Sequence, residues 1–419
     1  MQMPPVQIGF GSVIAFVVIF GLLVFFHEMG HFLLAKRAGI LCREFALGMG
    51  PKMFSFKRGE TEYTLRWLPI GGMVRMAGED PEMEVLQPHM EVGVLFNQAN
   101  QISHIYVTPK DIPNHATIGN VVRYDLEHDL IMTLDIQGEM KTFAVDPKTM
   151  LVIEGKEVQI APFNRQFKGK TIWQRFLAIF AGPAANFILA FVIFVMGALF
   201  FGAPSKDAVL GQVIPDGPAY QAGLKQGDRI ISIDGTPIND WNQFVGAVNA
   251  SPNKNIEMKI NRDGQDMVVP VQVNEQGKIM VGAGVKREIG LALTHGVDQT
   301  IFWTKTIFTN LAQLFTGHVS VKDLSGPAGI FTMTSQFAQN GLAALFTWTA
   351  LLSINLGIFN LLPIPALDGG RLVFIAIEAL RGKPIDPNKE GMVHFVGFAL
   401  LMMLILVVTW NDIQRLFLQ

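Results

Sequence analysis

The sequence predicts an α-helical polytopic membrane protein with about four transmembrane helices and several β-rich segments outside the lipid. Two observations carry this prediction. Half of the 419 residues are hydrophobic and 16% are charged, whereas about 25% of residues are charged in an ordinary soluble domain. In addition, four long and mainly apolar stretches each reach the roughly 20 residues that a helix needs to cross the hydrocarbon core. The net charge of −2 gives no reason to expect a nucleic-acid partner.

The predicted transmembrane helices are residues 8–35, 172–203, 338–366 and 391–414. The first is not expected to be a cleaved signal peptide, because no basic region precedes it and no small-residue cleavage site follows it. Lys and Arg residues follow the first stretch, precede the second, and lie between the third and fourth. By the positive-inside rule, these flanks are cytoplasmic. Both chain termini and the segment between the second and third stretches are then extracytoplasmic.

The segments between the stretches differ in composition. Glycine-rich, strand-like runs follow the first stretch and lead into a polar insert, in which Tyr124–Gly138 reads as a β-hairpin. A compact mixed α/β domain and an amphipathic helix suited to the membrane interface lie between the second and third stretches. The single cysteine, Cys42, excludes an intramolecular disulfide and has no CxxC partner for a metal. The predicted parts are a membrane-reentrant or cytoplasmic β region (37–82), a cytoplasmic β-rich insert (83–166), an extracytoplasmic domain (205–290), an interfacial helix (296–320) and a cytoplasmic loop (367–390).

The stretch HEMGH, at residues 27–31, carries the strongest chemical signal. On a helix, residues i and i+4 share a face one turn apart, so His27 and His31 can direct both imidazoles at one ion. Glu28 lies beside them and can act as a general base on water. Two histidines and a carboxylate at membrane depth are costly unless they are paired or bind a metal. A metal site with an adjacent base is therefore favoured over a chance match.

The third ligand of this site is expected to be Asp368. A catalytic zinc site usually has three protein ligands and one open position. Asp368 lies in NLLPIPALDGG (360–370), on the side where HEMGH emerges. Its prolines and glycines break the helix, and irregular backbone at membrane depth survives only inside protein or against water. The alternative is that Asp368 only forms a turn. The three ligands would also suit iron, but Glu28 favours hydrolysis and therefore one Zn²⁺ per chain.

Together these motifs resemble the site-2 protease family of intramembrane zinc metalloproteases, in its bacterial branch and most closely its Gram-positive type. HEMGH matches the family's HExxH, NLLPIPALDGG matches NxxPxPxLDGG, and FAGPAANF (180–187) matches a GPxxN-like element. Residues 211–238 look like a bacterial PDZ domain, although soluble proteins share that pattern. The resemblance covers nearly the whole chain. The chain departs from the two-PDZ type, because it has room for one PDZ domain and carries the 83–166 insert.

The resemblance implies zinc on the two histidines and Asp368, with Glu28 as catalytic base. It also implies that Asn360 contacts the substrate backbone. The alternative for Asn360 is a hydrogen bond between helices, which is the preferred interpretation of Asn186. The family places a reentrant β-structure within about 43–76, where a strand edge could add the substrate as a further strand. The residues predicted to form this edge are Gly71, Gly72, Met73 and Val74.

The function implied by the resemblance is intramembrane zinc endopeptidase activity in the bacterial cell membrane. The expected substrates are transmembrane segments of single-pass proteins, such as anti-sigma factor stumps and remnant signal peptides, with the extracytoplasmic PDZ domain screening them. The alternative is a catalytically silent membrane scaffold that presents a PDZ domain, which the retained Glu28 disfavours. A transporter is a third possibility, but no inverted repeat is visible.

Overall fold

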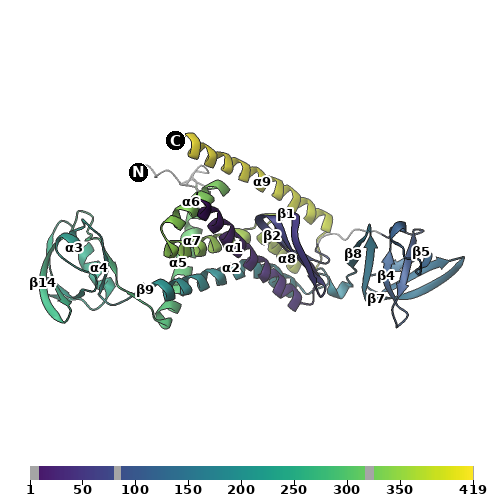
Figure 1. Cartoon of the computed structure of the whole chain (residues 1–419), viewed down its shortest axis with the longest axis horizontal. Helices are drawn as coiled ribbons and strands as arrows, with labels where there is room; N and C mark the ends of the chain where they lie inside the picture. The colour runs from purple at the N-terminus through teal and green to yellow at the C-terminus, as the bar shows by residue number, and fades with distance from the viewer. Residues whose placement is uncertain (1–8, 80–85, 317–324, 419) are drawn as a thin grey trace. The chain divides into compact units, whose positions relative to one another are not determined.

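The computed structural model describes residues 9–79, 86–316 and 325–418 (Figure 1). Residue 8 of the first predicted span, residues 80–82 of the β region, residues 83–85 of the insert and residues 317–320 of the interfacial helix lie outside the described residues. The chain divides into two compact units, of which the first comprises residues 1–189, 307–339 and 352–419. The second comprises residues 190–306 and 340–351.

Four helices in the described part of the chain are long and apolar enough to cross a membrane. The expectation of a polytopic membrane protein with about four spans and additional β-sheets is confirmed. Many large apolar side chains on these helices are exposed, as expected where lipid rather than protein covers them. The four helices are α1 (Phe10–Arg37), α2 (Ile172–Phe201), α7 (Leu342–Leu361) and α9 (Pro387–Leu418).

Two long bent strands, β1 (Cys42–Arg58) and β2 (Thr61–Met76), follow α1 in the first unit. Residues 42–47 lie in the middle of their sheet, because Ala46 pairs with Thr64 on one side and with Met73 on the other. The bends use left-handed backbone at glycines, with φ of +85° at Gly48 and +74° at Gly71, a conformation that glycine adopts without a steric penalty. Residues 72–76 therefore form an edge, and no other described strand pairs with them.

The insert between β2 and α2 is a small β-barrel. Its strands are ordered β4-β3-β5-β6-β7-β8, and an additional pairing of β4 with β7 closes the sheet. Buried aliphatic side chains such as Ile102, Ile105 and Leu134 fill its interior. The predicted hairpin at 124–138 covers the turn at which β5 and β6 pair antiparallel. The elements are β3 (Glu91–Phe96), β4 (Ile102–Tyr106), η1 (Pro109–Asp111), β5 (Thr117–Asp125), β6 (Ile131–Ile136), β7 (Glu139–Ile153), β8 (Lys156–Gln159) and η2 (Phe163–Arg165).

Two further helices complete the first unit, α6 (Pro327–Gln339) and α8 (Asp368–Arg381). The prediction of a loop over residues 367–390 is wrong, because α8 occupies much of it. The glycines after Asp368 suggested a helix breaker, yet they form the first turn of α8. The end of α8 was readable, since Gly382 adopts φ +66° as a C-terminal cap and Pro384 follows it, a combination typical of helix ends.

The second unit contains a mixed α/β domain with its own apolar core, which includes Leu210, Phe244 and Ile256. A four-stranded sheet of order β12-β11-β13-β14 forms its centre. Strands β9 and β16 pair with each other, so the chain enters and leaves the domain at one place. Helix α5 then begins at Ile289, earlier than the predicted start at 296. The elements are β9 (Ala203–Pro204), β10 (Leu210–Val213), α3 (Pro218–Gln221), β11 (Arg229–Ile233), β12 (Thr236–Pro237), α4 (Trp241–Asn249), β13 (Asn255–Arg262), β14 (Gln265–Gln272), β15 (Val281–Ala283), β16 (Val285–Lys286) and α5 (Ile289–Phe315).

Candidate metal centre

Three potential metal ligands from distant parts of the sequence meet in the first unit. His27 and His31 lie one turn apart on α1, and Asp368 is the first residue of α8. Oδ2 of Asp368 lies 3.2 Å from Nε2 of His27 and 3.3 Å from Nε2 of His31. The two Nε2 atoms are 3.3 Å apart. The sequence-predicted ligand set is therefore brought together with its donor atoms converging on one point.

The donor set suits a zinc ion. Two imidazoles and one carboxylate are ligands that zinc accepts in catalytic sites, with one position left open. Oδ2 of Asp368 is buried, and no hydrogen-bond donor among the described residues satisfies it. A buried carboxylate oxygen without a donor is costly. A cation between this oxygen and the two Nε2 atoms would remove that cost, so the residues present fit the group.

The second ring nitrogen of each histidine is also held. Nδ1 of His31 lies 2.9 Å from the carbonyl oxygen of Ala178, and Nδ1 of His27 lies 3.1 Å from the side-chain amide of Asn186. Histidines that bind metal through Nε2 carry their proton on Nδ1 and donate it to an acceptor. The amide as drawn presents its nitrogen to His27, while its own Oδ1 is buried without a partner. With the amide oxygen and nitrogen exchanged, Oδ1 of Asn186 would accept the Nδ1 proton of His27.

The contact with His27 is a hydrogen bond between helices, as the sequence favoured for Asn186, because it joins α2 to α1. Its partner is a candidate metal ligand, and the Asn186 side chain is fully buried. Ser353 of α7 donates a hydrogen bond of 2.7 Å to the backbone carbonyl of Asn186. The GPxxN-like motif was the available signal, but which face of α2 meets α1 could not be known from the sequence.

Two glycines allow α1 and α2 to approach at the histidines. A Cβ at Gly182 would lie 2.1 Å from Nε2 of His31, and a Cβ at Gly30 would lie 2.2 Å from the carbonyl oxygen of Ala181. Both distances are well below van der Waals contact. The glycine of the α2 motif is therefore required sterically, because any side chain at 182 would occupy the space in which the three ligands converge.

The glycines after Asp368 serve a similar purpose. A Cβ at Gly369 would lie 2.1 Å from the carbonyl oxygen of Leu362, and one at Gly370 would lie 2.5 Å from that of Ile364. The first turn of α8 is thus packed directly against the backbone that leads into it. This close packing limits the positions that Asp368 can take.

Glu28 lies where the β-sheet edge meets α1. A Cβ at Gly72 would lie 2.6 Å from Cγ of Glu28 and 2.8 Å from a methyl carbon of Val24. Glu28 is 9% exposed, so it is largely buried but keeps some solvent-accessible surface. The edge strand that includes Gly72, Met73 and Val74 therefore runs beside the candidate base.

Asn360 is half-buried on α7, and its side-chain Nδ2 donates to the carbonyl oxygen of Leu356 at 3.0 Å. Its Oδ1 thus remains the atom that a ligand could use. No contact between Asn360 and the three convergent ligands is seen among the described residues, so its role in substrate binding stays a prediction.

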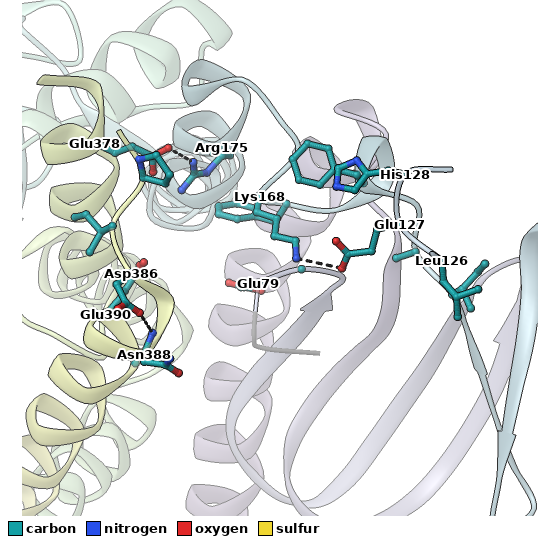
Figure 2. A pocket seen from close by; sticks show the side chains of 18 of the residues that line it. Glu79, Leu126, Glu127, His128, Lys168, Arg175, Glu378, Asp386, Asn388 and Glu390 are labelled. Atoms are coloured by element: carbon teal, nitrogen blue, oxygen red, sulfur yellow. Dashed lines mark hydrogen bonds and ion pairs between the residues drawn. The ribbon is translucent and has the colours of Figure 1, made fainter. Parts of the chain in front are cut away.

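A cavity of about 1340 Å³ adjoins α8 (Figure 2). Charged pairs line it, including Lys168 with Glu127 at 3.2 Å and Arg175 with Glu378 at 2.8 Å. Arg371 of α8 pairs with Glu79, three residues after the end of β2. The cavity is polar enough to hold water, and three of the residues that line it, Arg371, Ile375 and Glu378, belong to the helix that begins with Asp368.

Four apolar helices, one of which carries HExxH beside a third ligand and a base, define a membrane-embedded metallohydrolase. Comparison with known proteins makes this class specific. The model of peptidase family M50 matches residues 15–404. The chain is 51% identical over 418 residues to the "Regulator of sigma-W protease RasP" of Bacillus subtilis (strain 168), an alignment that covers 97% of this chain and 99% of the relative.

Two further relatives bear the name "Zinc metalloprotease RasP". The one from Geobacillus kaustophilus is 49% identical over 415 residues, covering 97% of this chain and 99% of the relative. The one from Bacillus licheniformis is 50% identical over 417 residues, covering 97% and 100%. The chain therefore belongs to peptidase family M50, the site-2 protease family. It is a zinc metalloprotease and a multi-pass membrane protein, as the motifs predicted.

Proposed function

We propose that the protein is an intramembrane zinc endopeptidase that cleaves the transmembrane segments of single-pass membrane proteins. The observation that carries this proposal is the convergence of His27, His31 and Asp368 to 3.2–3.3 Å, with both histidines on α1, a helix that is long and apolar enough to span a membrane. A protease whose ligands lie on such helices has its substrates in the same medium. Anti-sigma factor stumps and remnant signal peptides have the required single span.

In this mechanism His27, His31 and Asp368 would hold one zinc ion, which would act as a Lewis acid on the scissile carbonyl and lower the pKa of water. Glu28 takes the proton of the attacking water and passes it to the leaving amine nitrogen. Asn186 and the carbonyl of Ala178 keep the histidine rings oriented through their Nδ1 atoms. The buried setting excludes bulk water, which strengthens these interactions.

The substrate must be unwound before it can be cut, because a helix hides each carbonyl in an i→i−4 hydrogen bond. The edge formed by residues 72–76 offers unpaired backbone groups to an extended segment, which is recognition by β-augmentation. Gly72 lies against Glu28, so a strand added to this edge would pass the base. Asn360 would hold the substrate backbone from α7 through its free Oδ1.

The orientation proposed from the flanking basic residues puts the β1–β2 sheet, the insert and the cavity of Figure 2 on the cytoplasmic side. Water would reach the centre from that side, and the polar lining of the cavity near α8 supports this route. Both termini and the 205–290 domain would be extracytoplasmic. A cysteine-labelling experiment with a membrane-impermeant reagent tests this topology, starting from a Cys42→Ala background.

The 205–290 domain is proposed to be a PDZ domain that screens substrates by size. Its single entry and exit point, the β9–β16 pair, suits a domain attached to the membrane part at one place. Deleting residues 205–275 should allow cleavage of a substrate that retains a bulky ectodomain. If that substrate stays uncut while a truncated one is still cleaved, the domain is not the filter.

The metal analysis of purified protein tests the proposed function itself. The wild type should contain about one zinc per chain, and Asp368→Asn should lose zinc and cleavage of a single-span reporter together, because one ligand is weakened. A silent scaffold instead predicts no stoichiometric metal and no effect of the substitution. Tight zinc binding and full cleavage in Asp368→Asn would contradict the ligand assignment.

A further inference from the structure

Helix α9 contacts the loop that precedes Asp368. From the sequence, this helix was predicted only to span the membrane. Nδ1 of His394 accepts a hydrogen bond from the backbone N–H of Ala366 at 2.9 Å. Three residues further along α9, a Cβ at Gly397 would lie 2.3 Å from Cβ of Pro365 and 2.8 Å from its carbonyl oxygen. Helix α9 therefore contacts two consecutive residues of the loop, and Gly397 leaves the room that this contact needs.

The residue held by His394 has an unusual backbone conformation. Ala366 has φ +75°, in the left-handed region that residues with a Cβ avoid. Such a conformation persists when its surroundings determine it. The hydrogen bond from its N–H to His394 fixes the peptide plane at this point, two residues before Asp368. A rotation there would swing the Asp368 carboxylate away from the two histidines.

The ring of His394 is placed by its Nδ1 contact and by packing. Because Nδ1 accepts a hydrogen bond, the ring proton lies on Nε2, which has no hydrogen-bond partner among the described residues; the Glu390 carboxylate lies 3.8 Å from it. The ring also packs against Phe374 of α8, with 5.3 Å between ring centroids. His394 therefore connects the loop, α8 and α9 through one side chain that is 19% exposed.

We infer that His394 is a positioning residue for the metal centre: it holds Ala366 in its left-handed conformation and thereby directs Asp368 at His27 and His31. The inference rests on the proposed zinc site and adds a residue outside both metal motifs. Residues that orient a metal ligand typically contribute 10- to 100-fold to metal affinity or activity. The same size of effect is expected here, through the loop rather than through the ligand itself.

The test compares amide replacements that differ in where they place an acceptor. In His394→Asn, Oδ1 takes about the position of Nδ1 and can still accept from Ala366. In His394→Gln, the acceptor lies one bond further out, near the position of Nε2. Phe395→Ala is the control on the same helix, because Phe395 is 72% exposed. Full-length proteins in detergent are titrated with a zinc chelator, and the visible spectrum of the cobalt-substituted protein is recorded.

We expect His394→Gln to lose zinc affinity by about 10-fold or more and to change the cobalt spectrum. His394→Asn and Phe395→Ala should keep the affinity and the spectrum of the wild type. Equal zinc affinity and equal spectra for Gln, Asn and wild type would overturn the inference, as would equal losses for Gln and Asn. A wild type that binds no zinc would instead overturn the proposed function, and the inference with it.

Discussion

Gly72, at the start of the sheet edge, lies directly against Glu28 of α1: a Cβ at Gly72 would come within 2.6 Å of the Glu28 Cγ. The β-sheet edge and the candidate base therefore share one contact. This contact makes sense of a glycine in an edge strand, where a side chain would otherwise favour strand formation.

Substituting Gly72 by alanine should lower the cleavage rate without changing zinc binding. The new methyl group must displace Glu28 or the edge strand by about 1 Å, a displacement that can cost about 100-fold in rate. Zinc content should stay at the wild-type level, because Gly72 does not contact the ligands. Gly21→Ala is the matched control, since a Cβ there meets nothing within 4 Å. Wild-type cleavage of a single-span reporter by Gly72→Ala would show that the strand does not constrain the base.

Gly182→Ala, unlike Gly72→Ala, should weaken zinc binding. The methyl group would lie 2.1 Å from Nε2 of His31, so His31 must leave the metal position. We expect zinc affinity to fall by at least about 10-fold and cleavage to fall with it. Chelator competition and metal analysis measure this loss, again with Gly21→Ala as control. A variant that retained stoichiometric, tightly bound zinc would mean that His31 is not a ligand.

Asn186 provides a test of the histidine orientation. Asn186→Ala removes the acceptor for Nδ1–H of His27, and a loss of about 10- to 100-fold in zinc affinity is expected. Asn186→Asp keeps an acceptor oxygen and should retain most of the affinity. In a chelator titration, zinc affinity should decrease in the order wild type, Asn186→Asp, Asn186→Ala. If Asp weakened zinc binding as much as Ala, the amide would be acting as a donor and the proposed tautomer would be wrong.

The turn between β1 and β2 predicts a pH dependence of stability outside the membrane helices. Hydrogen bonds of 2.5 and 2.8 Å from Arg165 lower the pKa of Glu60 to about 2, from an ordinary value of 4.5. A carboxylate with a lowered pKa in the folded state stabilises it above the unfolded-state pKa. This stabilisation is lost as pH falls from about 4.5 towards 2.

Glu60→Gln removes the ionised partner of Arg165. The melting temperature of the variant should be lower than that of the wild type at pH 7, and the difference should shrink progressively below about pH 4.5. Melting curves of the detergent-solubilised protein at several pH values measure this. A difference that stays constant between pH 7 and pH 3 would show that ionised Glu60 does not contribute through this pair.

The metal motifs were readable from the sequence because their geometry is local. His27 and His31 are one helical turn apart whatever surrounds them, and the proline- and glycine-rich segment around Asp368 indicated an irregular backbone at membrane depth. The four apolar helices followed from length and composition alone. The family and the zinc metalloprotease class followed from the combination of motifs and are confirmed by the comparisons.

The partners of the supporting residues could not be predicted, because they depend on which helix faces meet. Asn186 touches His27 only because Gly182 and Gly30 let α1 and α2 approach. His394 is three residues from the start of the apolar part of α9, where a lone histidine carries no pattern. The prediction of a loop over 367–390 was wrong for a related reason. Glycines usually indicate a break in a helix, whereas Gly369 and Gly370 allow the first turn of α8 to pack closely against the preceding backbone.

The central claim is that Glu28 acts as the base beside a zinc ion held by His27, His31 and Asp368, and Glu28→Gln tests it most directly. Glutamine keeps the size of the side chain but cannot take a proton from water. Zinc content and cleavage of a single-span reporter are measured on the same purified, reconstituted sample. The account predicts about one zinc per chain in both proteins, with cleavage lost in the variant. Wild-type cleavage by a zinc-loaded Glu28→Gln would contradict it.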